Sequence, residues 1–403
     1  MPDQDRELID RLLDDRTYHI EFNGHLTNHS KHAVVALAGL GVPAERIRAY
    51  YENYAKLTTY GFGLEPPKPD RVTITEDNWR EHLGQRTSFW SYTAFFEARV
   101  EELGLRDAVR RYVPALLPGW TGAFTHATIH LGWALEYGHR WMAIEGLAYM
   151  AFSYADCHPE RMVDRYEEAT PYASLLRVAG EWDLRRDELK HSVADLIADT
   201  SPVDEGRIHP ELLRSGLQFR IARTLDAGPA LIRPAEAWAA DEAAPLDWDG
   251  LYYAVTLLYL ARPGDFVLLH LITSLYAVEH IAAELPEEQR QFAVRCFWTG
   301  LLGVVFSGGD FPERHKLAAL HELFAEAHDE GPEDFLRQEW ERTVARAVLE
   351  EEEHNPKLVH VLRRVWERGG RRSVYRVAAA QFTATPDLPP TFEEPPAEEP
   401  TAG

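Results

Sequence analysis

Apolar residues recur every three or four positions along most of the chain, which is the spacing of one face of an α-helix. In the first segment, Leu8, Ile9, Leu12 and Leu13 keep this spacing between charged residues. The alternation that indicates strands is confined to the short run 71–75. The pattern therefore predicts an all-α protein. We expect helices at 5–15, 30–40, 43 onwards, a short one after 75, 86–104, 120–154, 160–167, 170–196, 209–226, 229–240, 248–261, 264–284, 286 to about 307, 312–328, 332–350, 356–368 and 372–382.

Proline and glycine punctuate these segments without marking a boundary between domains. Gly41 ends one predicted helix and Pro43 begins the next, since proline suits the first turn of a helix. The segment 61–75 is rich in proline and is predicted to be a loop. The C-terminal residues, 384–403, are rich in proline and glutamate, a composition typical of disorder. We expect one large multi-helix domain over residues 1–383 and a disordered tail over 384–403.

Composition narrows the range of partners. The chain carries 65 acidic and 42 basic residues, a formal charge of −23, so neither nucleic acid nor an anionic membrane surface is an expected partner. The N-terminus is acidic and polar, without a secretory signal, and the longest apolar stretch, 251–285, is interrupted at 262–265. The two cysteines, Cys157 and Cys296, stand alone, which excludes a thiolate zinc site. These features predict a cytoplasmic protein.

Histidines in apolar segments supply the strongest chemical signal. His126 and His130 lie one turn apart in the stretch 120–152, so their imidazoles share one face of the predicted helix. The chain has a second pair at this spacing, His25 and His29. About one such pair is expected by chance among 18 histidines, so spacing alone is a weak signal of metal binding.

The apolar surroundings of these histidines strengthen the signal. His270 lies in 266–274, a segment that otherwise reads as core, and a neutral imidazole buried there needs a partner. For any one such residue, a bond to a backbone carbonyl or a carboxylate is the more common arrangement. Helix interiors offer few spare backbone acceptors, and several buried histidines together therefore favour a metal site.

An acidic run at 351–353 precedes a second group of candidate ligands. Pro356 begins a predicted helix, which would direct His354 and Lys357 toward one site. A lysine buried beside a cation can lose its proton and bind CO₂ as a carbamate, which is an oxygen ligand like a carboxylate. The alternative is a salt bridge between Lys357 and the neighbouring glutamates.

Four stretches together resemble the questin oxidase-like family, whose members include fungal enzymes that open anthraquinone-type rings. The stretches are Asn28-His29 before an Ala/Leu-rich helix, 122–136 around His126 and His130, 266–274 around His270, and 354–359 with His354 and Lys357. Each motif is short, and their order and spacing over most of the chain carry the likeness. Where the family more often has Gly-Ala-Phe-His-Pro-Leu-Ile-His, this chain has Thr125 inserted and Ala127 in place of proline.

The resemblance implies an all-α fold with a buried histidine-rich site, and oxidation of an aromatic polyketide-like substrate by O₂. It also implies a mononuclear non-haem Fe(II) centre, with a modified Lys357 as a possible oxygen ligand. Fewer than six protein ligands are expected, because O₂ and substrate also need room. The candidate ligands are His29, His126, His130, His270, His354 and Lys357. Such a ligand set suits iron but also zinc, copper or nickel. Trp133 and Tyr137 are the predicted substrate-stacking residues.

Two other functional interpretations compete with a mononuclear iron oxygenase. Glu136-x-x-His139 and Glu351-x-x-His354 have the spacing found in ferritin-like di-iron carboxylate proteins, which would need further glutamates such as Glu97 or Glu279. The other is a non-catalytic helical protein that binds an aromatic or lipid-like ligand. Nicotinamide (NADPH), flavin and nucleotide binding are unsupported, since no GxGxxG after a strand and no GxxxxGK[ST] occurs.

Overall fold

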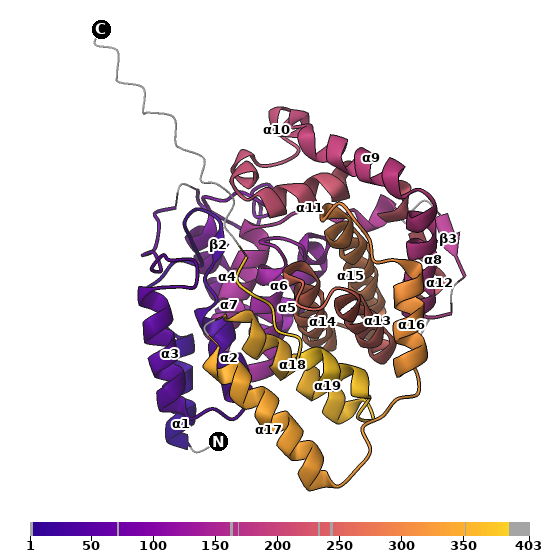
Figure 1. Ribbon diagram of the computed structural model, residues 1–403. Helices are drawn as coiled ribbons and strands as arrows, with labels where there is room; N and C mark the ends of the chain where they lie inside the picture. The colour runs from indigo at the N-terminus through magenta and orange to yellow at the C-terminus, as the bar shows by residue number, and fades with distance from the viewer. Residues whose placement is uncertain are drawn as a thin grey trace.

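The computed structural model describes residues 3–386 except 71, 162–163, 168, 233, 242–244 and 351, and this part of the chain is predominantly α-helical (Figure 1). The all-α prediction is confirmed. The helices are α1 Asp3–Leu13, α2 Ser30–Gly39, α3 Ala44–Lys56, α4 Phe89–Leu103, α5 Leu105–Leu116, α6 His126–Tyr137, α7 Arg140–Phe152, α8 Pro171–Leu184, α9 Arg186–Ala198, α10 Ser201–Asp204, α11 Gly216–Ala227, α12 Ala237–Ala240, α13 Trp248–Ala261, α14 Phe266–Glu284, α15 Glu287–Ser307, α16 Arg314–Phe324, α17 Glu333–Leu349, α18 His354–Arg368 and α19 Ser373–Ala379.

The described strands are short and lie outside the predicted run 71–75. β1 (Glu21–Phe22) and β2 (Leu26–Thr27) form an antiparallel hairpin, and β3 (Asp164–Tyr166) pairs in parallel with β4 (Pro234–Glu236). The expected helices at 160–167 and 229–240 are replaced by this second pair, flanking 3₁₀ turns and the four-residue α12. The segment 229–240 is rich in apolar residues, whereas 160–167 is mostly charged, and in neither do enough residues keep the helical spacing.

Helix boundaries differ from the prediction where local backbone geometry interrupts the apolar pattern. The stretch 120–154 forms two helices, α6 and α7, because Gly138 has a φ of 80° that ends α6. The segment 170–196 likewise divides into α8 and α9 at Arg185. The helix α5 was not predicted. The short helix expected directly after residue 75 is replaced by turns.

The centre of the molecule is a group of helices that are apolar all round. Helix α6 packs against α7 and α14, α14 also packs against α15, and the rest of the chain covers these helices (Figure 1). By length and composition α14 could cross a membrane, which corrects the expectation that no apolar run reaches that length. Its most apolar window is 72% buried inside the protein, as in a core helix.

The first and last parts of the chain pack together, as Figure 1 shows for α2 and α18. The ring of His360 on α18 lies where a side chain on Gly39 of α2 would be, so the two helices approach closely. One hydrophobic cluster extends from Ile9 to Ala379. A single domain over 1–383 stays a prediction, and residues 387–403 of the predicted tail lie outside the described part of the chain.

Close helix approach in the centre depends on glycine. A Cβ on Gly132 of α6 would overlap backbone atoms of Ala277 on α14, and neither helix has room to move within the packed core. We expect Gly132→Ala to lower the free energy of unfolding by about 1–3 kcal/mol, measured by urea denaturation. Gly216→Ala is the matched control, because no heavy atom lies within 4 Å of its added Cβ. Equal effects of the two substitutions would contradict this account.

Candidate functional site

Three histidines from distant parts of the sequence meet in the interior. His29 precedes α2, His126 begins α6 and His354 begins α18, and one ring nitrogen from each lies within 4.8 Å of the others. All three side chains are buried. The positive ends of three helix dipoles therefore converge here, which disfavours protonated imidazoles. Burial itself lowers the pKa of each of these histidines well below the usual 6.5.

His270 of α14 extends this cluster through a contact with His126. The Nδ1 of His126 lies 2.7 Å from the carbonyl oxygen of Ala123, and that of His270 lies 2.7 Å from the carbonyl oxygen of Phe266. Because a carbonyl only accepts, both Nδ1 atoms carry hydrogen. In neutral rings both Nε2 atoms then carry lone pairs, yet they are 2.9 Å apart. Burial lowers the pKa of His270 to about 3, so a metal cation is a better bridge between these lone pairs than a proton.

His354 presents a lone pair in the same way. Its Nδ1 is hydrogen-bonded to the carboxylate of Glu352, and its Nε2 is buried without a partner in the described part of the chain. A histidine whose second nitrogen is held by a carboxylate is the usual arrangement of a metal ligand. Two nitrogens at about 2.1 Å from one ion and at right angles are about 3 Å apart, close to the separation of His126 and His270. The donor set therefore fits a metal ion.

Lys357 and Glu353 complete the interior of the cluster. The Nζ of Lys357 lies 2.9 Å from Nδ1 of His29, and the carboxylate of Glu353 lies 3.9 Å from Nε2 of the same ring. Burial lowers the pKa of Lys357 to about 8, and burial with the neighbouring Glu352 raises the pKa of Glu353 to about 7. The Lys357 amine and the Glu353 carboxyl therefore both exchange protons near neutral pH.

His130 lies outside this cluster, although it shares a helix face with His126. Its Nδ1 is 3.0 Å from Nε2 of His32, and its Nε2 is 3.4 Å from Glu145, which pairs with Lys31 at 2.5 Å. The buried carboxylate is the charged neighbour that the sequence could not identify, although it makes no hydrogen bond with this Nε2. Among the described residues, His130 belongs to no group of three potential ligands. His270 belongs to none either, but its Nε2 lies 2.9 Å from that of His126.

His32 was missed by the sequence analysis. Its ring centroid lies 5.6 Å from that of His29 and 6.3 Å from that of His126, and its Nδ1 is buried without a described partner. The signal was present in the sequence as an i, i+3 pair with His29, a spacing that also places two residues on one helix face.

The backbone entering α6 is unusual. Ala123, Phe124 and Thr125 have φ values of 51°, 52° and 69°, in the left-handed region that L-residues avoid. This path brings the carbonyl of Ala123 to His126 and places the ring of Phe124 4.3 Å from that of His270. The sequence departure noted at Thr125 falls within this turn. Such strain persists only where the surroundings fix it, and it clusters at functional sites.

A cavity of about 640 Å³ opens beside the histidines. His29 and His126 form part of its wall, together with the apolar side chains of Phe124, Phe219 and Phe266. The rings of Phe124 and Phe266 are stacked with centroids 5.8 Å apart and border the histidine cluster. Volume and lining suit a polycyclic aromatic ligand.

The predicted substrate contacts, Trp133 and Tyr137, do not line this cavity. Trp133 is buried against His360 and Tyr276, and its Nε1 reaches the carbonyl of Thr273 at 3.4 Å. Tyr137 lies toward α1, under the guanidinium of Arg6. Both residues follow His130 on α6 and so project away from the end of the helix where the cavity lies.

The glutamates of the di-iron reading do not gather at one point. Glu136 pairs with His360 at 3.1 Å, whereas His139 faces Asp14 at 3.5 Å. Glu279 binds Arg368 and Tyr252, and Glu97 binds Arg16. Glu351 lies outside the described residues. Among the described residues, Glu97, Glu136 and Glu279 therefore do not form a carboxylate-bridged pair.

The family model described as questin oxidase-like matches residues 26–362 of this chain. The Baeyer-Villiger monooxygenase AacuH of Aspergillus aculeatus is 25% identical over an alignment of 373 residues. The match covers 78% of this chain and 73% of the relative. The Baeyer-Villiger oxidase AgnL3 of Paecilomyces divaricatus is 30% identical over 146 residues, 32% of this chain and 30% of its own length. The oxidoreductase AflY of Aspergillus parasiticus is 29% identical over 141 residues, 33% of this chain and 28% of its own.

The lowered histidine pKa values predict that the metal-free protein loses stability in mild acid. His270 stays neutral in the fold until about pH 3, whereas the unfolded chain takes up its proton near pH 6.5. The unfolded state therefore binds more protons between these values, and stability falls as pH drops below 6.5. From pH 7 to 5 we expect His270 to contribute a loss of about 2 kcal/mol, measured by urea unfolding.

The matched comparison uses His270→Gln and the exposed His315→Gln. The first substitution should remove about 2 kcal/mol of the pH-dependent loss, and the second should leave the loss unchanged because the side chain of His315 is 80% exposed. An unchanged pH dependence in His270→Gln would contradict a neutral, buried His270.

Proposed function

The chain belongs to the questin oxidase-like family, and we propose that it is a non-haem, metal-dependent oxygenase that opens a ring of an aromatic polyketide of the anthraquinone type. The relatives named as oxidase, monooxygenase and oxidoreductase support an oxidative reaction. The small substrate and O₂ are its reaction partners. The structural support comes from the cavity, which places an apolar binding surface beside a cluster of unprotonated imidazoles.

One observation carries the proposal: the paired Nε2 lone pairs of His126 and His270, 2.9 Å apart, beside the unpartnered Nε2 of His354. Buried acceptors without donors are costly, and a metal cation satisfies them together. His29 and Lys357 lie at the same place and complete the proposed ligand shell. His130, whose Nδ1 contacts His32 and whose Nε2 lies 3.4 Å from the carboxylate of Glu145, is omitted from it.

Iron(II) is the proposed ion. Zinc would fit the nitrogen ligands but has no redox chemistry, whereas the named activities of the relatives are oxidative. When bound, iron would supply the one-electron chemistry that allows O₂ to react with an organic substrate. The protein holds the imidazoles neutral and fixes their orientation through the carbonyls of Ala123 and Phe266 and the carboxylate of Glu352.

Lys357 is proposed to supply an oxygen ligand as a carbamate. With a pKa of about 8, a fraction on the order of a tenth of the amine is neutral at pH 7. The neutral nitrogen adds to the carbon of CO₂, forms an N–C bond and releases one proton, leaving a carboxylate-like group. The neighbouring Glu353, with a pKa of about 7, is placed to accept that proton.

The cavity indicates how an aromatic substrate would be bound. A planar ring system would lie against Phe124 and Phe266, and these rings exclude water from the reacting carbons. In a Baeyer–Villiger reaction, one oxygen atom is inserted between a carbonyl carbon and its neighbour, and hydrolysis of the resulting cyclic ester opens the ring. The second oxygen atom leaves as water, which takes two protons and two electrons from an external reductant.

Metal content tests the proposal. Protein purified without chelating resin should contain about one iron per chain by mass spectrometry, and His354→Ala should reduce the iron at least tenfold because a ligand with a fixed orientation is lost. His315→Ala, an exposed site, is the control. Bicarbonate should increase Fe(II) uptake by the wild type but not by Lys357→Met.

The alternative functions give different results in the same experiment. Two irons per chain would move the assignment to a di-iron oxidase. A folded wild type that neither contains metal nor takes up added Fe(II) would leave a helical protein that binds an aromatic ligand.

Turnover gives an independent test. With Fe(II) and a reductant, a hydroxyanthraquinone should gain one atom from ¹⁸O₂ in the ring-opened product, detected by mass spectrometry. We expect Phe266→Ala to raise KM at least tenfold, because the stacking surface beside the histidines is removed. Phe335→Ala is the control, since that side chain is 54% exposed and does not line the cavity. Absence of ¹⁸O from every ring-opened product would rule out oxygen insertion.

A further inference from the structure

The charge of the cavity wall differs from that of the whole protein. The chain has 65 acidic residues and a net charge of −23, yet no aspartate or glutamate is among the described residues that line the cavity. The wall does contain a guanidinium, that of Arg220. An acidic protein that keeps carboxylates away from one cavity and places an arginine there has a local preference for negative charge.

Arg220 is placed on α11, one of the helices gathered at the end of the molecule opposite α17 (Figure 1). Its Nε is buried and has no hydrogen-bond partner, and no carboxylate of the described residues lies within 4.0 Å of its guanidinium. Arg223, three residues further along the same helix, is bound to Asp199 at 3.0 Å and Asp226 at 3.3 Å. On α11, Arg223 is therefore paired with carboxylates, whereas Arg220 on the cavity wall is not.

A second side chain on this wall also has a buried polar atom without a hydrogen-bond partner. Gln218 is only 8% exposed, and its Nε2 donates to the carbonyl oxygen of His25 at 3.3 Å. That bond fixes the orientation of the amide and leaves Oε1 as the free acceptor. This oxygen is buried without a partner in the described part of the chain. The α11 wall thus offers one cationic donor and one neutral acceptor.

Buried polar groups in native proteins normally have partners, since an unmet donor or acceptor costs free energy. Here both residues line the cavity that opens at the histidine cluster, so a ligand bound there lies against their side chains. A guanidinium binds carboxylates and other anionic oxygens more strongly than neutral groups. An amide oxygen, such as Oε1 of Gln218, accepts hydrogen bonds and so suits a hydroxyl group.

We propose that Arg220 determines substrate specificity by binding an anionic oxygen on the aromatic ligand, while Gln218 accepts a hydrogen bond from a hydroxyl of the same ligand. The inference rests on the proposed function for the identity of the cavity as the substrate site. It adds that the substrate is an aromatic acid, ionised at a carboxylate or a phenol, and not a neutral quinone. The phenylalanines at the histidine end bind the apolar part of the ligand, and α11 binds the charged part.

The test measures binding to metal-free protein, so it does not depend on turnover. A hydroxyanthraquinone carboxylic acid and its carboxamide are titrated at pH 7.5 by isothermal calorimetry. A second pair, a phenol that is fully ionised at this pH and its methyl ether, distinguishes a phenolate from a carboxylate. The wild type should bind the anion of at least one pair at least tenfold more tightly than its neutral partner.

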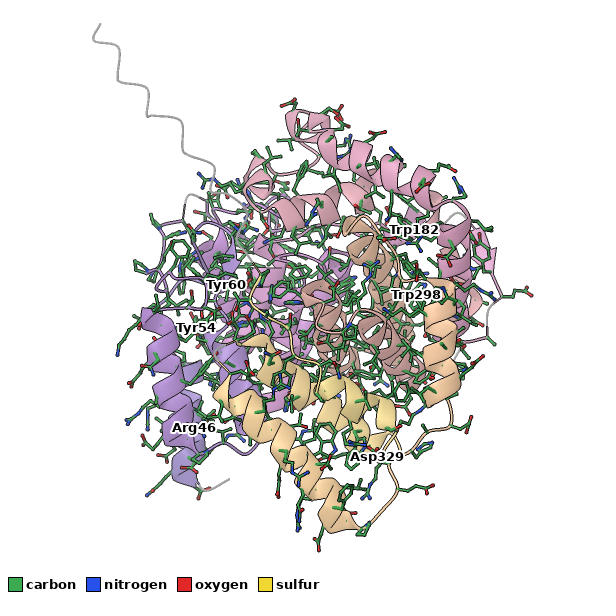
Figure 2. All side chains as sticks on the ribbon, viewed as in Figure 1. Arg46, Tyr54, Tyr60, Trp182, Trp298 and Asp329 are labelled. Atoms are coloured by element: carbon green, nitrogen blue, oxygen red, sulfur yellow. The ribbon has the colours of Figure 1, made fainter. Side chains whose placement is uncertain are left out.

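Variants assign that preference to the two residues. Arg220→Gln should abolish the discrimination while changing the affinity for the carboxamide less than twofold, and Arg220→Lys should retain part of it. Gln218→Leu should weaken binding of hydroxylated ligands at least fivefold relative to their methoxy analogues. Arg46→Gln is the matched control, because Arg46 is an exposed arginine on α3, remote from α11 (Figure 2).

Several outcomes would overturn the inference. These are equal wild-type affinity for charged and neutral members of both pairs, discrimination that persists in Arg220→Gln, and failure of every probe to bind. Failure of the proposed function is distinguishable from these results. Charge-selective binding without any oxygenation would refute the oxygenase assignment alone, and turnover without charge discrimination would refute the role of Arg220 alone.

Discussion

The need to keep several buried imidazoles neutral governs the architecture of this site. Each of His126, His270 and His354 has its Nδ1 tied to a fixed acceptor, which leaves Nε2 with a lone pair directed into the interior. The acceptors belong to the turns before α6 and α18 and to the first turn of α14. The left-handed turn at 123–125 and the carboxylate of Glu352 therefore fix the orientation of the His126 and His354 imidazoles.

A second layer of buried polar contacts supports this arrangement. Tyr54 links His29 to Glu353, as its hydroxyl accepts from the backbone N–H of His29 and lies 3.5 Å from the carboxylate. Figure 2 places Tyr54 and Tyr60 on the same side of the molecule as the N-terminal helices. On the other side of the cluster, His32 joins it to His130, Glu145 and Lys31. Buried networks of this kind tolerate few changes, because removal of one member leaves another unsatisfied.

The cavity joins two regions of different chemical character. At the histidine end its wall is formed by stacked phenylalanines, and on α11 it carries Gln218 and Arg220. A ligand that matches both regions is held in one orientation, with a defined carbon next to the proposed metal. Orientation matters for oxygen insertion, since insertion at a different ring bond would give a different product.

The sequence by itself determined the fold class and several of the buried histidines, among them His126, His130 and His270. Helical periodicity needs only local spacing, and a histidine within an apolar helix must be buried wherever that helix packs. The sequence could not distinguish His126 from His130, one turn apart, because the carboxylate of Glu145 that engages His130 comes from the neighbouring helix α7. The only local signal for His32 was its i, i+3 spacing from His29, and no local signal favoured Phe124 over Trp133 as a cavity residue. The Nδ1 atoms of His126, His270 and His354 bond to acceptors two to four residues away in the chain. The tertiary structure decided which imidazole nitrogens meet and where the cavity opens, because the paired imidazoles come from segments 98 and 144 residues apart.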